Sequence, residues 1–130
     1  KSGEHRLHGQ RPFFAHRIAD REHCGLRTHI EKRLEMAKLS EQEIAELMPA
    51  VPGWSVVVEA GIGRLQRTFT FGDFVEALAF TNRVGDLAEA ADHHPRIVTE
   101  WGRGTLTWWS HDLGGMVTND FEMAKRVDRL

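Results

Sequence analysis

Residues 72–95 read GDFVEALAFTNRVGDLAEAADHHP, and the fold prediction starts from this segment. Proline is absent until its last position, and its apolar side chains recur at the spacing of one helical face, which predicts a helix over residues 72–91. Asp73 is a suitable N-terminal cap. The helix must end near Pro95, because the residue before a proline is driven out of the α region. The predicted apolar face comprises Phe74, Ala77, Leu78, Val84, Leu87, Ala88 and Ala91.

A β-hairpin is predicted on each side of this helix. Before it, residues 54–59 and 64–71 are rich in β-branched and aromatic side chains, and the segment 60–63 supplies the turn residues between them. After it, residues 97–101 and 105–110 have the same character and flank a Gly-Arg-Gly turn. The long helix therefore joins two hairpins.

A shorter helix is expected at each end of this arrangement. Ser40 and Glu43 have the spacing of a capping box, and the helix that they begin must stop before Pro49. Thr118 or Asn119 is the expected cap of the last helix. The predicted order is α-β-β-α-β-β-α, which favours an α+β fold with a four-stranded antiparallel sheet and three helices packed on one face.

Length and composition bound the class of protein. The chain has 130 residues, enough for one compact domain, and its formal net charge of −2 gives no electrostatic reason to expect direct nucleic-acid binding. No apolar run approaches the roughly 20 residues that span a bilayer, so we expect no membrane partner. The single cysteine, Cys24, excludes an internal disulfide. These features together predict a cytoplasmic protein.

The net charge averages over two unlike parts of the chain. Residues 1–35 carry eight Lys/Arg and five Asp/Glu, whereas residues 36–130 carry nine and fourteen. Five of the eight histidines also lie in the first part, without the spacing of a metal-binding motif. We therefore predict a basic, histidine-rich leader, either an extension added upstream or a genuine appendage, followed by an acidic domain.

Three places in the acidic domain carry side chains suited to chemistry. Imidazoles exchange protons near neutral pH, and neighbouring carboxylates can orient them, so a cleft that gathers both suits general acid–base catalysis. The end of the long helix and the end of the fourth strand can lie at one edge of an antiparallel sheet. The residues concerned are Glu89, Asp92, His93 and His94 before Pro95, then Ser110, His111 and Asp112, and finally Asp120.

These residues by themselves leave three interpretations open. An adjacent pair of histidines at a helix end is commonly a solvated terminus or a structural cap. The pair can also serve acid–base catalysis. It can bind a metal, although adjacent side chains rarely point the same way and no further ligand spacing is evident. The neighbouring Trp108 and Trp109 are expected to point to opposite faces of a strand, which favours core packing and a cleft wall.

Residues 36–130 resemble the pterin-4a-carbinolamine dehydratases, also called 4a-hydroxytetrahydrobiopterin dehydratases. The order, spacing and type of the residues match over the length of the domain. Gly104 departs from the pattern, because the family usually has a larger residue there, and we expect it to loosen the second hairpin turn. The resemblance rests on Glu89-x-x-x-His93-His94-Pro95, on Trp101 six residues later, on Ser110-His111, and on Asp120 nine residues after His111.

The resemblance implies the predicted fold, assembly into homodimers or homotetramers, and a hydro-lyase that needs neither a metal nor another cofactor. The implied reaction converts a 4a-hydroxytetrahydropterin to the quinonoid dihydropterin and water, in tetrahydrobiopterin recycling. Its implied catalytic groups are His93, His94 and His111, with Glu89 and Asp120 orienting them. Contacts with the pterin substrate are implied at Asp92, Pro95, Trp101, Ser110 and Asp112.

The resemblance also implies an alternative from another class of function. Members of the family can act as dimerisation partners of transcription factors, and related proteins serve as assembly chaperones. Such a scaffold would bind a protein partner through its outer faces and would not need the five histidine and carboxylate residues named as catalytic and orienting groups. Their presence favours a working site.

Overall fold

The computed structural model describes residues 37–130, and the elements within that range confirm the predicted fold class. The leader predicted for residues 1–35 lies outside the described residues, as do Cys24 and five of the histidines. The described elements are α3 (Glu41–Leu47), the 3₁₀ helix η1 (Met48–Ala50), β1 (Ser55–Glu59), β2 (Ile62–Thr70), α4 (Phe74–Ala91), β3 (Arg96–Glu100), β4 (Arg103–Trp108), the 3₁₀ helix η2 (His111–Leu113) and α5 (Thr118–Asp128).

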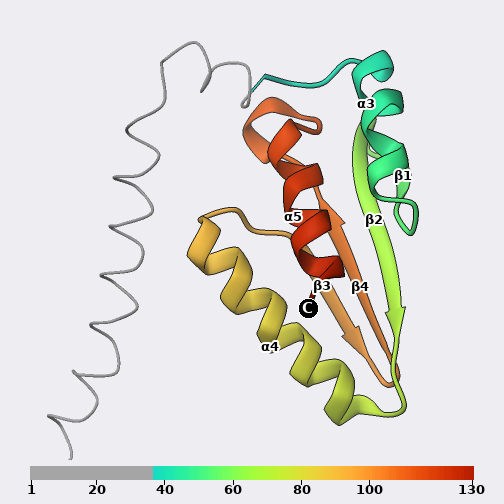
Figure 1. Cartoon of the computed structure of the whole chain (residues 1–130), viewed down its shortest axis with the longest axis vertical. Helices are drawn as coiled ribbons and strands as arrows, with labels where there is room; N and C mark the ends of the chain where they lie inside the picture. The colour runs from blue at the N-terminus through green and yellow to red at the C-terminus, as the bar shows by residue number, and fades with distance from the viewer. Residues whose placement is uncertain (1–36) are drawn as a thin grey trace, which may run out of the picture.

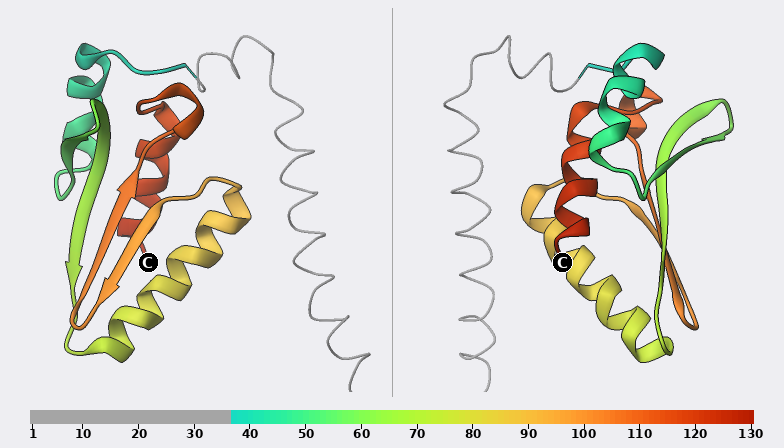
Figure 2. Two further views of the ribbon diagram at one scale, coloured as in Figure 1. Left: turned by 180° about the vertical axis from the view of Figure 1, so that it is seen from behind. Right: turned by 45° about the vertical axis from the view of Figure 1, so that its right-hand side comes forward.

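The four strands form one antiparallel sheet in the order β1-β2-β4-β3. β1 pairs with β2 in the first hairpin, and β3 pairs with β4 in the second. The two hairpins join through β2 and β4, so β1 and β3 are the edge strands. Helices α3, α4 and α5 lie on one face of this sheet (Figures 1 and 2). Within residues 37–130, no helix combines the length and the apolar character that crossing a membrane requires.

Local interactions explain where α3 and α4 begin and end. Ser40 and Glu43 form the predicted capping box, with backbone-to-side-chain distances of 3.0 and 3.2 Å. Asp73 caps α4 as predicted, because its carboxylate accepts from the Glu76 backbone N–H at 2.8 Å. At the other end Asp92 adopts a left-handed conformation with φ of 51°, which turns the chain out of the helix.

The apolar face predicted for α4 is partly wrong. The buried side chains are Ala77, Phe80, Val84 and Ala88, whereas Phe74 and Leu78 are 44% and 43% exposed. Successive helical residues differ by about 100° in direction, so Leu78 points well away from the row that begins at Ala77. Phe74 is the first residue of the helix, at the margin of the packed face.

In the second hairpin, the first strand ends one residue earlier and the second strand begins two residues earlier than predicted. β4 already begins at Arg103, and Gly102 supplies the left-handed turn conformation with φ of +72°. Gly104 pairs within the sheet with Phe69 and Thr99, so it lies in β4 and not in the turn that it was expected to loosen. Its place in the register puts it under the α4 side of the sheet, beside the Phe80 ring.

The start of α5 also differs from the prediction. The helix begins at Thr118, so neither Thr118 nor Asn119 is its cap, and the residue in the cap position is Val117. Valine has no side-chain acceptor. Instead, the Asp120 carboxylate accepts a hydrogen bond from the Val117 backbone N–H at 2.8 Å. A side chain of the first helical turn thus supplies a partner for a backbone N–H at the start of the helix.

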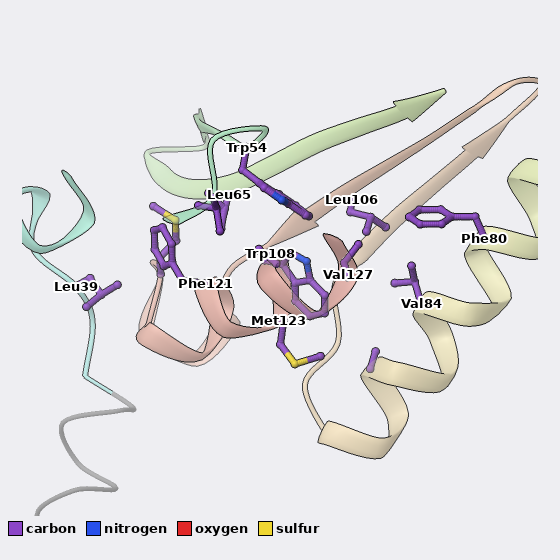
Figure 3. Packing of buried hydrophobic residues seen from close by; sticks show 14 residues of the cluster. Leu39, Trp54, Leu65, Phe80, Val84, Leu106, Trp108, Phe121, Met123 and Val127 are labelled. Atoms are coloured by element: carbon purple, nitrogen blue, oxygen red, sulfur yellow. The ribbon is translucent and has the colours of Figure 1, made fainter. Parts of the chain in front are cut away.

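The core fills the space between the sheet and the helices (Figure 3). Leu65, Leu106 and Trp108 project from the two central strands and are fully buried. Trp108 lies among side chains of α5 that include Met123 and Val127. Burying these side chains removes a large apolar area from water, at about 25 cal/mol per Å², and this fixes α5 across the sheet.

Candidate functional site

The structure brings together the end of α4, the segment after β4 and the start of α5. The Nε2 atom of His93 lies 2.5 Å from Oδ1 of Asp120, which is 27 residues later in the chain. The hydroxyl of Ser110 donates to the other oxygen of Asp120 at 3.4 Å. These three residues form one hydrogen-bonded group. His93 follows α4, Ser110 follows β4 and Asp120 lies in α5, so the members are far apart in the sequence.

Asp120 is fully buried, and both of its oxygens have partners. Oδ1 meets His93, while Oδ2 accepts the Val117 backbone N–H at 2.8 Å and the Ser110 hydroxyl. A carboxylate removed from water is costly unless hydrogen bonds replace its hydration. The three bonds meet that requirement and fix the plane of the carboxylate against the imidazole.

The imidazole of His93 is also held by an aromatic ring. It stacks on the indole of Trp108 with the ring planes 4° apart and the centroids separated by 5.5 Å. Its backbone N–H donates to the Ala88 carbonyl at 3.1 Å, so the residue is tied to the last turn of α4. Because Nε2 meets Asp120, proton exchange with a ligand would use the other ring nitrogen, Nδ1.

His94 belongs to a separate and more exposed pair. Its Nε2 atom lies 2.8 Å from Oε2 of Glu89, which is on the last turn of α4. The His94 side chain is 55% exposed, against 18% for His93. The two adjacent histidines therefore have different carboxylate partners and different access to solvent.

His111 makes a third set of contacts. It is the first residue of η2, and its ring lies against the indole of Trp109 with a centroid distance of 4.4 Å and an angle of 44°. Trp109 follows Trp108 directly, and the alternation of side chains along an extended chain points the two indoles to opposite faces of the sheet. His93 and His111 thus each pack on one of two neighbouring tryptophans.

The residues predicted to contact the substrate divide into two groups. Asp92 is the exposed end of α4, Pro95 follows the two histidines, and Asp112 lies in η2 beside His111. Trp101 differs, because it is 72% exposed in the turn between β3 and β4. The length of β3 separates this turn from the end of α4 (Figure 1), a span of roughly 20 Å at 3.3 Å per residue. The structure of one chain does not bring Trp101 to His93.

Two contacts of the site were not predicted from the sequence. Trp108 was expected in a strand, as part of the core or of a cleft wall, but nothing along the chain pairs it with His93. The backbone N–H of Val117 has no sequence signature of its own, and its bond to Asp120 was not predicted. Among residues 37–130, no group of three or more His, Cys, Asp or Glu side chains is arranged to hold a metal ion.

The fold and these contacts define a class of protein. It is a small α+β domain with three helices on one face of an antiparallel sheet, and a histidine paired with a buried carboxylate lies where α4, β4 and α5 meet. The family model described as pterin 4 alpha carbinolamine dehydratase matches residues 37–130. The chain belongs to this family, and the resemblance stated from its motifs is confirmed.

Individual relatives agree with this assignment. Two curated proteins named "Putative pterin-4-alpha-carbinolamine dehydratase" are similar to the chain. The protein from Chlorobium limicola is 60% identical over 92 residues, which cover 71% of this chain and 81% of that protein. The protein from Nitrosococcus oceani is 54% identical over 98 residues, 75% of this chain and 87% of its own length.

A solved structure also has the same fold. The crystal structure of a transcriptional coactivator/pterin dehydratase from Brucella melitensis aligns with a TM-score of 0.65 at 31% sequence identity. The alignment covers 72% of this chain and 97% of the Brucella chain. The order of helices and strands predicted from the sequence is therefore that of a known pterin dehydratase structure.

Proposed function

We propose that the chain catalyses the dehydration of a 4a-hydroxytetrahydropterin to the quinonoid dihydropterin and water, in tetrahydrobiopterin recycling. Family membership supports the pterin as the substrate class. The observation that carries the catalytic proposal is the buried Asp120 carboxylate bonded to His93, because a fixed carboxylate holds an imidazole in one orientation for proton transfer.

The proposed chemistry needs only an acid and a base. The bond between C4a and the hydroxyl oxygen breaks, and that oxygen leaves as water after it takes a proton. The neighbouring ring nitrogen loses its proton, and its electron pair forms the new double bond to C4a. His93, His94 and His111 are the proposed proton donors and acceptors, with Asp120 and Glu89 as the partners of the first two.

The test is a dehydration assay with a 4a-hydroxytetrahydropterin, with formation of the quinonoid product followed by absorbance against the uncatalysed rate. Loss of a general acid or base typically costs about 10²–10⁴ in rate. We therefore expect His94→Ala and Asp120→Asn each to lower kcat by about 10² or more. His94 is exposed, so its variant should keep the stability of the wild type.

Glu122→Gln is the matched control for Asp120→Asn. Glu122 lies two residues further along α5 and forms an exposed ion pair with Lys125 at 3.0 Å, so its change should leave kcat unaltered. The proposal fails if the wild type does not exceed the uncatalysed rate, or if both site variants keep full activity. An inactive wild type that binds a specific protein partner would instead support the scaffold function.

We also propose that the chain works as a homodimer or homotetramer, as the family resemblance implies. Three apolar side chains are exposed on the first turns of α4: Phe74, Val75 and Leu78. Residues three and four apart are neighbours on a helix surface, so these side chains form a continuous apolar patch that a second copy would cover. Light scattering after size-exclusion chromatography measures the mass, and a monomer at micromolar concentration would contradict the proposal.

A further inference from the structure

The face of the sheet opposite the helices carries a cluster of side chains around one indole. We call it the indole cluster, and its members are Glu59, Arg64, Arg96, Trp109 and His111. Trp109 follows β4 on the side away from the core, yet it is only 8% exposed. Because the helices lie on the other face of the sheet, the remaining members of the cluster must shield the Trp109 indole from solvent.

Two guanidinium groups lie over the indole. The Cζ atoms of Arg64 and Arg96 are 4.0 and 5.4 Å from the Trp109 ring centroid. The sheet register explains the first contact, because Leu65 pairs with Trp108 and this places Arg64 beside Trp109. Cations at these distances are attracted to the face of an indole, so both arginines restrain its position.

Glu59 holds the two guanidinium groups in place. Arg96 donates to both Glu59 oxygens at 2.8 Å, which is the bidentate geometry of a strong ion pair. Arg64 donates to the Glu59 backbone carbonyl at 3.3 Å, and its side chain is largely buried. Glu59 is on β1 and Arg96 is on β3, so their ion pair links the two edges of the sheet across the indole.

The indole is in turn the ring against which His111 packs. His111 begins η2, which has only three residues, and the Ser110 backbone bonds to Gly115 at 2.7 Å to close the loop around it. These bonds fix the backbone of the loop, but they do not fix the direction of the imidazole. The contact with Trp109, at a centroid distance of 4.4 Å, supplies that restraint.

We infer that Trp109 is a positioning residue for His111, and that Arg64 and Arg96 act through it. The inference rests on the proposed function in one respect, because it takes His111 as a group that exchanges protons with the substrate. In the proposed reaction, His111 is the one member of the cluster that acts on the substrate. Its effect therefore belongs to the catalytic step and leaves substrate binding largely unchanged.

The kinetic test uses the full chain with Trp109→Leu, which removes the ring, and Trp109→Phe, which keeps one. We expect Trp109→Leu to lower kcat by about tenfold with little change in KM, since a small displacement of a catalytic group is costly. Trp109→Phe should keep most of the activity. In a His111→Ala background, Trp109→Leu should cause no further loss. A further tenfold loss in that background would overturn the inference.

Trp54→Phe is the matched control for a general loss of stability. Trp54 is buried and bonded to Asp128 at the far end of α5, so its change should lower the melting temperature without lowering kcat. If kcat falls with the melting temperature in this control as it does in Trp109→Leu, the effect at Trp109 is structural and the inference is wrong.

A spectroscopic readout keeps the inference testable if the chain has no dehydratase activity. The Cε1 proton of His111 should shift in the NMR spectrum when the Trp109 ring is removed, because the ring current of the indole then disappears. Arg96→Gln, a change at a partly exposed position, should shift the same proton in the same direction without unfolding the chain. An unchanged resonance in both variants would overturn the inference independently of the proposed reaction.

Discussion

Asp120 serves the helix and the candidate site with the same carboxylate. Oδ2 accepts the Val117 backbone N–H at the start of α5, and Oδ1 meets the His93 imidazole. Because the side chain is fully buried, neither bond competes with water. The formation of α5 therefore also places the group that orients His93.

Gly104 offers a prediction at the scale of one residue. A Cβ atom built there would lie 3.4 Å from the Phe80 ring and 3.6 Å from the Phe71 ring, which is ordinary van der Waals contact. Replacing glycine by alanine without strain stabilises a protein by about 0.4–1 kcal/mol, since the unfolded chain loses freedom. Gly104→Ala should therefore raise the free energy of unfolding in urea by about that amount.

Gly102→Ala provides the contrast in the same hairpin. Its φ of +72° is unfavourable for alanine, and a Cβ atom would lie 3.2 Å from the Phe71 carbonyl oxygen. This variant should be less stable than the wild type. If Gly104→Ala also destabilises the chain, the space beside Phe80 is tighter than the structure shows.

At the scale of the element, α5 is fastened at both ends. His93 meets its first turn, and at the other end Asp128 accepts from the Trp54 indole N–H at 2.9 Å. Arg67 of β2 also donates to Asp128 at 2.9 Å. The helix is thereby held to the segment before β1 and to the sheet, in addition to its apolar packing.

Asp128→Ala tests this fastening. The change leaves the buried Trp54 N–H without its acceptor, and an unsatisfied buried donor costs about 1–3 kcal/mol. We expect the free energy of unfolding to fall by that amount, while kcat stays unchanged because about 12 Å of helix separates Asp128 from Asp120. Asp86→Ala, at an exposed position of α4, is the control and should change stability little. Equal stability of the two variants would contradict the prediction.

At the scale of the whole molecule, the two faces of the sheet have different supports. The helices and the apolar core cover one face, and the indole cluster covers part of the other. The Glu59–Arg96 pair connects the edge strands over the second face. The hydrogen bonds from Arg96 lower the pKa of the Glu59 carboxyl. Burial opposes them, and the charges of Arg96 and Arg64 add to the lowering.

The lowered pKa of Glu59 predicts a dependence of stability on pH. The ionised carboxylate is favoured in the folded state, so its contribution is complete above the unfolded-state pKa of about 4.3 and is lost as pH falls through the lower folded-state pKa. The difference in unfolding free energy between the wild type and Glu59→Gln should therefore be largest near pH 7 and should shrink below pH 4. Urea unfolding at several pH values measures it.

Arg96→Gln is the control for this prediction. It removes the group that lowers the pKa of Glu59, so a Glu59→Gln change made in that background should have little pH-dependent effect on stability. A difference between the wild type and Glu59→Gln that stays constant from pH 7 to pH 3 would contradict the assignment of the ion pair.

The order of elements, the fold class and the family could all be predicted from the sequence. Helical and strand periodicities are local properties, and the capping box of Ser40 with Glu43 and the cap at Asp73 involve residues three apart, so short stretches of sequence are enough to predict them. The family was identified from the order and spacing of several features along the chain. These are the Glu89-x-x-x-His93-His94-Pro95 motif, Trp101, Ser110-His111 and Asp120. The misplaced boundaries, at Gly102 and at Val117, lie where a turn or a cap depends on a backbone conformation.

The contacts between distant side chains could not be predicted from the sequence, because they depend on how the elements pack. His93 and Asp120 are 27 residues apart, and Glu59 and Arg96 are 37 apart. These contacts depend on the register of β2 against β4 and on the packing of α5 across the sheet. Neither produces a periodic pattern of residue types in the sequence. The same packing gave His93 and His94 different partners, because it buried Asp120 beside one histidine and left the other at the surface with Glu89.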